Sequence, residues 1–259
     1  MSLLKVTNLG KSFGGVKAVD GISFELAAGE LLALIGPNGA GKTTTFNMVN
    51  GQLKASAGSI TLDGHELLGM APRDIWRLGV SRTFQIAETF LSLTVIENVQ
   101  MALLSRDKKL FSFFTRAAHY KRDEALALLE QVSMRPQAAR ACSELAYGDV
   151  KRVELAIAMA NAPRLLLMDE PTAGMAPKER NDLMALTKQL VTERNMAVLF
   201  TEHSMDVVFA YADRMIVLAR GRLIAGGKPL EIRDDPKVQE VYFGTGKTFE
   251  KNSVPGAVA

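Results

Sequence analysis

The stretch "GPNGAGKTT", residues 36–44, decides the fold class of this chain. It follows the short apolar run "LLALI" (31–35) and leads into "TTTFNMVNG" (43–51), which has the length and mixed polarity of the first turns of a helix. The loop matches the pattern G-x-x-x-x-G-K-[ST] through Gly36, Gly41, Lys42 and Thr43. In that pattern backbone N–H groups wrap phosphates, and the N-terminus of the helix adds unpaired donors and a positive dipole end. The sequence therefore predicts a strand–loop–helix unit that binds a nucleoside triphosphate.

Side-chain roles within this loop follow from the same chemistry. Lys42 is expected to reach the β- and γ-phosphates, and Thr43 is expected to ligate Mg²⁺. The whole loop is a candidate for contact with the nucleotide: Gly36, Pro37, Asn38, Gly39, Ala40, Gly41, Lys42, Thr43 and Thr44. The alternative is an ordinary glycine-rich turn before a helix, which the strand before the loop and the helix after it make the weaker interpretation.

Composition sets limits on the class of protein. The chain has 259 residues, 47% of them hydrophobic, which is enough for one large α/β unit or two smaller lobes. The formal net charge is +3 with no long block of one sign, so we expect no nucleic-acid partner. Cys142 is the only cysteine, which excludes an internal disulfide, suits a reducing compartment and favours a buried small side chain over a nucleophile.

No targeting or membrane-spanning segment is evident in the sequence. The first residues, "MSLLKVTNLGKSF", lack the basic and then apolar pattern of a signal peptide, and no apolar run approaches the roughly 18–20 residues that cross a bilayer. A cytoplasmic location is therefore expected. Any membrane role would come through a partner.

Hydrophobic patterns divide the chain into two kinds of sheet and a helical region. Three segments with turn residues at their ends are predicted to be antiparallel strands: 3–13, 21–30 and 57–67. The later apolar runs "RLLLMDEP" and "MAVLFTEH" each follow a helical stretch, as strands of a buried parallel sheet do, and 213–227 is predicted to be a closing hairpin.

The region between these strands has helical spacing. From about residue 86 to 143 strand signals fade, and "RDEALALLEQV" (122–132) is the clearest amphipathic helix. We therefore expect a single domain with a core lobe of 1–85 and 150–240, an inserted helical lobe of 86–149 and a C-terminal tail of 241–259. The last residues of that tail, "KNSVPGAVA" (251–259), are expected to be frayed.

Two carboxylates mark the end of one predicted buried strand. Asp169 and Glu170 emerge at the carboxyl edge of the sheet, where α/β proteins place their ligands. Beside a P-loop, Asp169 is expected to hold Mg²⁺ and Glu170 to act as the general base that polarises the attacking water. The alternative is a strand-end acidic pair that is merely solvated.

Two further residues complete the predicted reaction site. His203 follows the second apolar strand and so lies at the same sheet edge, where a neutral imidazole can hydrogen-bond the γ-phosphate and help to orient the water. Gln85, in "SRTFQ" after a predicted strand, can reach both the metal and the water, and is expected to contribute to catalysis and to the metal site.

Five motifs in order resemble the nucleotide-binding subunits of ABC transporters: "GPNGAGKT", "SRTFQ", "LAYGD" before "VKRVELAIAMA", "LLLMDEPTAG" and "TEH". The resemblance covers essentially the whole chain. It implies an α/β P-loop NTPase fold, the ABC nucleotide-binding domain, with an antiparallel β subdomain and an inserted α-helical subdomain. It also implies that ATP is the ligand and that two such subunits close head to tail over two ATP molecules.

The resemblance assigns roles to individual residues. Lys42 and Thr43 correspond to the Walker A motif and Gln85 to the Q-loop. Asp169 and Glu170 correspond to Walker B, and His203 to the switch histidine. Phe13 is similar to the aromatic residue that stacks on adenine, a contact that contributes roughly 1–3 kcal/mol by analogy with base–aromatic stacking. The alternative for Phe13 is a core phenylalanine.

Two motifs depart from the common family pattern. Where most members have Leu-Ser-Gly-Gly-Gln, this chain has "LAYGD" (145–149), so the serine hydroxyl that faces the partner's γ-phosphate is replaced by Ala146. Backbone N–H groups of Ala146, Tyr147 and Gly148 are then expected to meet that phosphate. Ala176 also stands where many members have Asp or Asn, which puts one contact across the dimer in doubt.

The branch that "LAYGD" resembles serves branched-chain amino-acid importers. "TVIENV", "EPTAG" and the segment 226–244 are similar to this branch and in part to lipid-exporting relatives. The resemblance implies integral membrane permease subunits and a second ATPase subunit, identical or paralogous, as partners, with this chain peripheral on the inner face of the membrane. The alternatives are another cargo (urea or amide import, lipid export) or a soluble ABC ATPase without a transport role. A P-loop GTPase is disfavoured because an Asn-Lys-x-Asp motif is absent.

Overall fold

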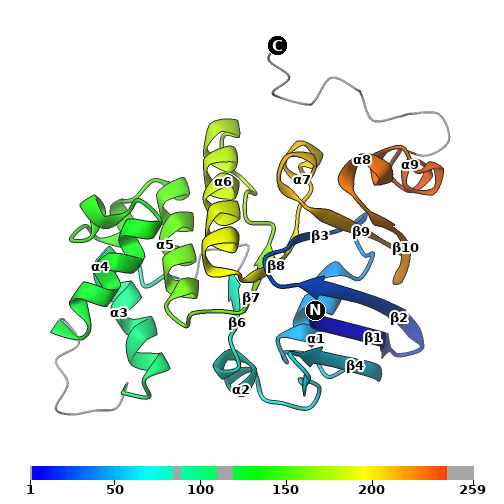
Figure 1. The fold of residues 1–259 in the computed structure, drawn as a ribbon, viewed down its shortest axis with the longest axis horizontal. Helices are drawn as coiled ribbons and strands as arrows, with labels where there is room; N and C mark the ends of the chain where they lie inside the picture. The colour runs from blue at the N-terminus through cyan, green and yellow to red at the C-terminus, as the bar shows by residue number, and fades with distance from the viewer. Residues whose placement is uncertain (1, 84–88, 110–118, 244–259) are drawn as a thin grey trace.

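The computed structural model describes residues 2–83, 89–109 and 119–243. Two sheets lie side by side, with a group of helices along one flank (Figure 1). Gln85 lies outside the described residues.

The first sheet is antiparallel and has the strand order β2-β1-β4-β5. Its strands are β1 (Ser2–Phe13), β2 (Val16–Ala27), β4 (Ala57–Leu62) and β5 (His65–Glu66). Leu4 and Val6 of β1 alternate with more exposed residues, because successive side chains of a strand point to opposite faces. The predicted antiparallel strands are confirmed, but β2 begins at Val16 and ends at Ala27, and the third segment turns at Asp63 and Gly64 into the separate strand β5.

The second sheet has the order β10-β9-β3-β8-β7-β6 and is parallel except for the β9–β10 hairpin. Its strands are β3 (Leu31–Ile35), β6 (Val80–Thr83), β7 (Leu165–Asp169), β8 (Ala197–Thr201), β9 (Arg214–Ala219) and β10 (Arg222–Gly227). β3 and β8 are buried along their whole length, as expected for parallel strands covered on both faces. The predicted parallel sheet and closing hairpin are both confirmed.

The α-helices are α1 (Lys42–Val49), α2 (Pro72–Arg77), α3 (Val95–Arg106), α4 (Arg122–Gln131), α5 (Tyr147–Met159), α6 (Pro177–Arg194), α7 (Met205–Tyr211), α8 (Pro229–Arg233) and α9 (Pro236–Phe243). Two short 3₁₀ helices, η2 (Arg135–Gln137) and η3 (Cys142–Glu144), precede α5. None of the helices in the described parts of the chain combines the length and hydropathy that a membrane span requires.

Helices α3, α4 and α5 pack on one another and form the flank seen at the left of Figure 1. The amphipathic helix predicted over 122–132 is confirmed as α4. α5 also contacts β6 and α6, so it joins this flank to the second sheet. The division into a core lobe and a helical lobe at 149/150 stays a prediction, because α5 crosses that boundary and packs against both parts.

Hydrophobic side chains form two cores on opposite faces of the second sheet. Leu31, Ala33 and Ile35 belong to the core that includes α3–α6, whereas Leu32 and Leu34 belong to the core shared with the antiparallel sheet and α1. The strand that leads into the P-loop is thus fixed from both faces, and the loop begins from a rigid base.

Cys142 lies inside the helical flank, as predicted for a small buried side chain. It is almost fully buried, and the Nδ2 of Asn98 lies 3.2 Å from its Sγ. Burial raises the pKa of the Cys142 thiol, which keeps it protonated and unreactive.

A charged network joins the C-terminal end of α3 to the N-terminal end of α4. Arg106 donates to Glu124 (2.7 Å), and Asp107 accepts from Lys121 (2.7 Å) and from the Tyr120 hydroxyl (2.5 Å). Hydrogen bonds from Arg106, Lys121 and Tyr120 hold the pKa of Asp107 far below its usual range. We call these five residues the α3–α4 network.

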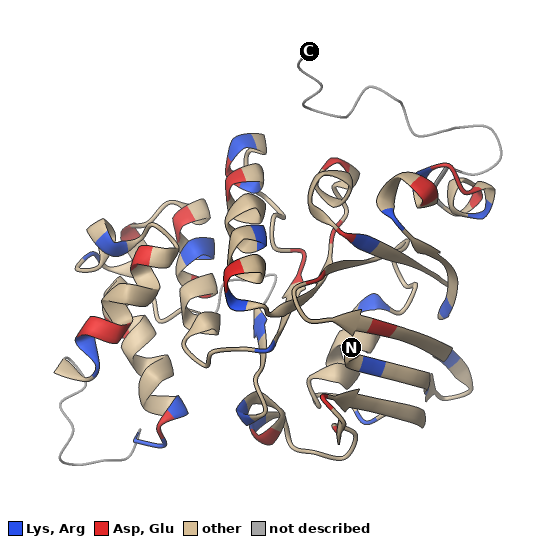
Figure 2. Ribbon diagram, viewed as in Figure 1, with Lys and Arg blue, Asp and Glu red and all other residues tan. Residues whose placement is uncertain are grey.

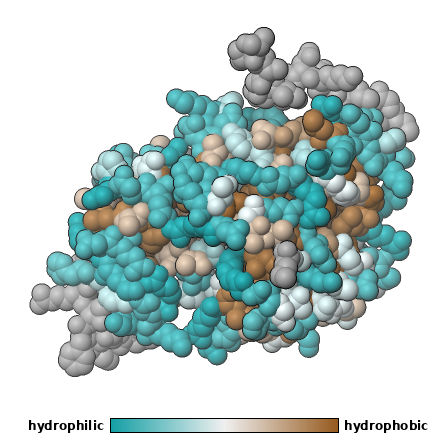
Figure 3. All heavy atoms as spheres, in the orientation of Figure 1, coloured by the Kyte–Doolittle hydropathy of each residue, from teal (hydrophilic) through white to brown (hydrophobic). Residues whose placement is uncertain are grey.

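Charged side chains of both signs occur on the helices and strands (Figure 2), and the face shown in Figure 3 is largely hydrophilic. Lys and Arg alternate with Asp and Glu along α6 (Figure 2). Hydrophobic residues are confined to small patches on the face shown in Figure 3.

Candidate nucleotide-binding site

The P-loop connects β3 to α1, as predicted, and its glycines are required by close backbone contacts. A Cβ atom on Gly36 would lie 2.2 Å from the Leu218 carbonyl oxygen, and one on Gly41 would lie 2.6 Å from the Ala18 carbonyl oxygen. Both glycines have φ in the region that favours glycine, 154° and 106°. The first and last glycines of the motif thus allow the loop to pack between β9 and β2.

Lys42 is folded into the loop that precedes it. Its Nζ donates to the carbonyl oxygens of Gly36 (2.7 Å) and Pro37 (3.2 Å), and the residue is buried. Burial lowers the pKa of Lys42, and the nearby carboxylates of Glu170 and Asp169 partly oppose that shift. The ammonium is therefore held next to the backbone that is predicted to wrap the phosphates.

The threonines at the start of α1 differ in their exposure. Thr45 is buried and donates its hydroxyl to the Gly41 carbonyl oxygen (2.9 Å), whereas Thr43 is exposed and Thr44 is half-buried. Pro37, Asn38 and Gly39 are exposed as well. The open side of the loop therefore carries the Thr43 hydroxyl, as a ligand to a bound metal would require.

Asp169 and Glu170 lie at the carboxyl end of β7, and Thr201 of β8 organises both. Thr201 is paired with Asp169 in the sheet register. Its hydroxyl donates to Asp169 Oδ1 (2.8 Å) and accepts the Glu170 backbone N–H (3.1 Å). Glu170 itself has φ of 48°, a left-handed conformation that is uncommon outside glycine and that recurs at functional sites.

Glu170 and His203 are in direct contact. The Nε2 of His203 lies 2.8 Å from Oε1 of Glu170, the histidine being half-exposed and the glutamate mostly buried. The two residues predicted to activate water and to sense the γ-phosphate are therefore brought together at the same sheet edge, on neighbouring strands.

A buried carboxylate fixes the backbone next to this pair. Glu202 accepts hydrogen bonds from the backbone N–H and the hydroxyl of Thr172 (2.9 and 2.6 Å) and from the His203 N–H (3.2 Å). It thereby joins the turn after β7 to the turn after β8. The position of His203 depends on this link as well as on its own contact with Glu170.

Sequence reasoning missed three residues of this edge: Arg82, Thr201 and Glu202. All three lie inside stretches that the motifs include, "SRTFQ" and "FTEH". The only signal that could have found them is their position: each is a charged or polar residue at the end of an apolar strand, where burial requires a hydrogen-bond or ion-pair partner. Arg82 contacts Asp169 at 2.9 Å and is almost fully buried.

Phe13 lies half-exposed at the end of β1, paired with Val16 of β2. The Lys11 ammonium lies 5.0 Å from the centroid of its ring. Because β2 also contacts Gly41, this hairpin lies beside the P-loop. The exposed ring suits a stacking surface better than a core side chain, and its role stays a prediction.

The "LAYGD" segment begins helix α5. Ala146 and Tyr147 are exposed, whereas Gly148 is buried in the second position of the helix. A Cβ on Gly148 would lie 3.2 Å from the Glu179 carboxylate and 3.5 Å from Met175. Glu179 also accepts the N–H of Ala176 at the start of α6 (3.2 Å). The exposed start of α5 is therefore Ala146 and Tyr147 rather than Gly148.

The residues present fit a magnesium ion. The hydroxyl of Thr43 and the carboxylate of Asp169 are hard oxygen donors, which Mg²⁺ prefers. Across the described residues no three His, Cys, Asp or Glu side chains cluster as a self-contained metal site. An ion held here would take its remaining ligands from the nucleotide and from water, as Mg²⁺ usually does.

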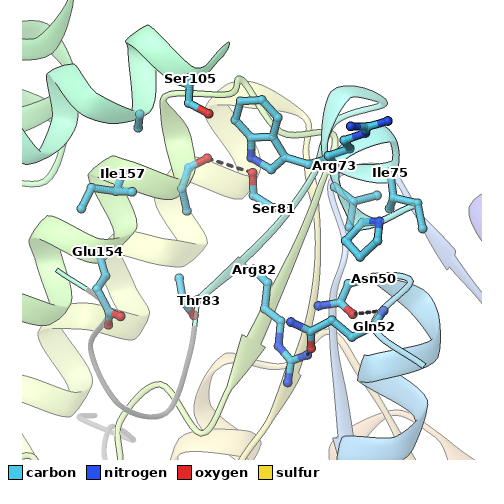
Figure 4. A pocket seen from close by; sticks show the side chains of 15 residues that line it. Asn50, Gln52, Arg73, Ile75, Ser81, Arg82, Thr83, Ser105, Glu154 and Ile157 are labelled. Carbon is cyan, nitrogen blue, oxygen red and sulfur yellow. Dashed lines mark hydrogen bonds between the residues drawn. The ribbon is translucent and has the colours of Figure 1, made fainter. Parts of the chain in front are cut away.

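A cavity of about 440 Å³ lies next to this site but does not include the P-loop. It is lined by the end of α1, by α2 and β6 on one side and by α3 and α5 on the other, and Figure 4 shows Arg82 and Gln52 at one end of it. This cavity and the predicted phosphate site are therefore different places.

Two family models match the chain. One, described as ABC transporter, matches residues 19–173, which is more than half of the chain. The other, described as branched-chain amino acid ATP-binding cassette transporter, matches residues 222–248. The chain therefore belongs to the ABC transporter family, and the predicted class, an ABC ATPase, is confirmed.

Curated relatives match over nearly the full length. The high-affinity branched-chain amino acid transport ATP-binding protein LivG of Salmonella typhimurium is 41% identical over 249 residues, which is 93% of this chain and 98% of that protein. BraF of Pseudomonas aeruginosa, which carries the same description, is 38% identical over 252 residues, with 93% and 98% coverage. The predicted resemblance to this branch of the family is confirmed.

Solved structures show the same fold. The ADP conformation of an ATP-binding cassette from an ABC transporter superposes with a TM-score of 0.84 at 31% identity and covers 94% of this chain and 99% of that one. A dimeric cassette in a post-hydrolysis state bound to ADP and Pi superposes with a TM-score of 0.73 at 25% identity, with 87% and 98% coverage. The predicted fold class is confirmed.

Proposed function

We propose that this chain is the ATP-hydrolysing subunit of a membrane importer of branched-chain amino acids. The observation that carries the proposal is the full-length match to LivG, together with the match of residues 222–248 to a family model restricted to that transport branch. The C-terminal match distinguishes this branch from ABC ATPases in general, because it lies outside the P-loop, the "LAYGD" segment and the β7 carboxylates.

Binding of ATP is proposed to use the P-loop and the hairpin beside it. Backbone N–H groups of residues 36–44 surround the phosphates, and Lys42 moves its ammonium from the loop carbonyls to the β- and γ-phosphates. Thr43 and Asp169, with Gln85, hold Mg²⁺, which when bound neutralises charge on the phosphate oxygens. Phe13 stacks on the adenine ring.

Hydrolysis is proposed to depend on the contact between Glu170 and His203. Glu170 accepts a proton from the water that attacks the γ-phosphorus, and the products are ADP and inorganic phosphate. His203 orients the Glu170 carboxylate and, once ATP is bound, donates toward the γ-phosphate. Gln85 is assigned to positioning the same water. Thr201 and Glu202 hold the two turns that carry these groups.

The partner subunits are proposed to complete and use this site. A second ATPase subunit, a copy or a paralogue, places its own signature segment over the nucleotide. A similar cassette solved as a dimer bound to ADP and Pi supports the pairing of two such subunits. The exposed Ala146 and Tyr147 of this chain serve the nucleotide of that partner in return. Integral permease subunits hold the pair on the cytoplasmic face of the membrane and carry the amino acid across.

The cargo is tested with the assembled transporter. The chain is co-expressed with its neighbouring permease genes and the purified complex is placed in liposomes, with ATP on the side of the ATPase subunits and a matched binding protein on the other. ATP-dependent uptake of labelled leucine, isoleucine or valine is expected. Uptake of urea or an amide, export of lipid, or failure to co-purify with any permease would replace this proposal with one of the alternatives.

A further inference from the structure

We propose that Arg82 is a positioning residue for the magnesium site. Its guanidinium joins helix α1, which carries Thr43, to strand β7, which carries Asp169, and so fixes the spacing of the two ligands before the metal arrives. The inference rests on the assignment of Thr43 and Asp169 to Mg²⁺ under Proposed function.

The contacts of Arg82 reach two different elements. One terminal nitrogen donates to Asp169 Oδ2 (2.9 Å). The other donates to Asn47 Oδ1 (2.7 Å) on α1 and to Gln52 Oε1 (3.0 Å) just beyond that helix. Since Arg82 belongs to β6, a single side chain links three separate segments.

Helical geometry gives this link its functional meaning. Asn47 lies four residues after Thr43 on α1, so both occupy one face of the helix. An arginine that holds Asn47 therefore holds the face that presents the Thr43 hydroxyl. On the other side Asp169 is held between Arg82 and the Thr201 hydroxyl, so that each of its oxygens has one fixed donor.

Burial and shape show why an arginine is needed here. The Arg82 side chain is 8% exposed and the Asp169 side chain 14%, so their charges compensate each other away from bulk water. The guanidinium lies 5.7 Å from the centroid of the Phe46 ring, which restricts its plane. A planar fork directs its two terminal nitrogens at different acceptors, whereas a lysine has one nitrogen and can satisfy one side only.

The position of Arg82 in Figure 4 is consistent with a connecting role. Its side chain extends from β6 toward Gln52 at the end of the cavity between α2 and α5. Arg82 therefore acts through Asp169 and Asn47, both of which it contacts directly.

The test separates metal-dependent from metal-independent ATP binding. In the Glu170→Gln background, which is expected to prevent turnover, the dissociation constant of ATP is measured in excess Mg²⁺ and in excess EDTA. Arg82→Gln is expected to weaken binding about 10-fold or more in Mg²⁺, the range seen when partners of metal ligands are removed, and to leave the value in EDTA within about twofold. Arg82→Lys is expected to remain defective because it cannot link both elements.

Controls distinguish the possible outcomes. Arg164→Gln makes the same chemical change in an exposed ion pair with Asp63 and is expected to alter neither constant. Asn47→Ala keeps the Arg82–Asp169 pair, and a smaller loss confined to Mg²⁺ is expected, which provides a second test should Arg82→Gln fold poorly. Asp169→Asn reports on the metal assignment itself: if it has no Mg²⁺-specific effect, the proposed function of Asp169 fails first.

Three results would overturn the inference while leaving that assignment intact. Equal losses in Mg²⁺ and EDTA for Arg82→Gln would show a general structural role. Tighter binding in Mg²⁺ would show that Arg82 repels the ion rather than preparing its site. Full recovery by Arg82→Lys would show that charge alone suffices and that the link to α1 is irrelevant.

Discussion

Two groups of charged residues in this molecule differ in what their charges accomplish. In the α3–α4 network every named side chain is paired with an opposite charge or a hydroxyl, and the pairing holds the pKa of Asp107 far below its usual range. At the edge of the second sheet Lys42 is buried against backbone carbonyls, and burial lowers its pKa. The first group stabilises the fold, whereas the second retains charges at an energetic cost, as functional sites commonly do.

Replacement of Glu170, at the edge of the second sheet, is expected to change ATP hydrolysis more than any replacement in the α3–α4 network. Replacement by Gln keeps the shape and the contact with His203 but removes the base, so we expect steady-state ATP hydrolysis to fall by a factor of about 10²–10⁴. The dissociation constant of ATP should stay within about threefold, because the P-loop holds the phosphates. Hydrolysis near the wild-type rate in the purified variant would exclude Glu170 as the base.

Phe13 tests whether the β1–β2 hairpin beside the P-loop contributes to nucleotide binding, as the residues at the edge of the second sheet are proposed to do. Phe13→Ala should weaken ATP binding by about 1 kcal/mol, or roughly fivefold, at the low end of base–aromatic stacking. GTP should be affected similarly, because stacking tolerates a change of base. Nucleotide titrations of Phe90→Ala, another exposed phenylalanine, provide the control. An unchanged dissociation constant for Phe13→Ala would make the ring a surface residue without a ligand.

Asp107 tests the structural role of the α3–α4 network, where the expected effect on stability and activity is the smallest of the three. Asp107→Asn should lower the free energy of unfolding by about 1 kcal/mol at pH 7 and leave the ATPase rate unchanged. A carboxyl whose pKa is lowered by folding contributes its stability above its unfolded value near 4 and loses it as the pH falls toward the folded value. The difference between the two proteins should therefore be constant from pH 6 to 8 and shrink below about pH 4.

Urea denaturation of both proteins at several pH values measures this difference. Asp63→Asn removes a carboxylate from an exposed ion pair and should change the free energy of unfolding less than Asp107→Asn does. A large loss of ATPase activity in Asp107→Asn would contradict the division into two groups.

The sequence was sufficient for the parts of the site that depend on local geometry. A Cβ atom on Gly36 or Gly41 would lie 2.2 or 2.6 Å from a backbone oxygen, so both positions of the motif require glycine in this loop. Asp169 and His203 follow buried strands, and the parallel order of those strands brings them to one edge.

Contacts between segments distant in sequence could not be predicted in this way. The link from Arg82 to Asp169 spans 87 positions and the link from Thr172 to Glu202 spans 30, and neither has a periodic signal. Gly148 is a further case: the motif suggests an open helix start, but Met175 and Glu179 of the following segment cover it. The fold, and not the motif, determines which of these backbone groups is exposed.

The rise in unfolding temperature caused by MgATP tests the division between the two groups most directly. A ligand that binds only the folded state stabilises it by RT ln(1 + L/Kd), where L is the free ligand concentration, so at a fixed ligand concentration tighter binding raises this temperature more. In Asp107→Asn the baseline should fall but the rise with MgATP should equal that of the wild type. In Lys42→Met the baseline should not fall, because a buried charge is removed, and the rise should disappear. A full rise in Lys42→Met, or its loss in Asp107→Asn, would contradict the assignment of the sheet edge to nucleotide and of the α3–α4 network to stability.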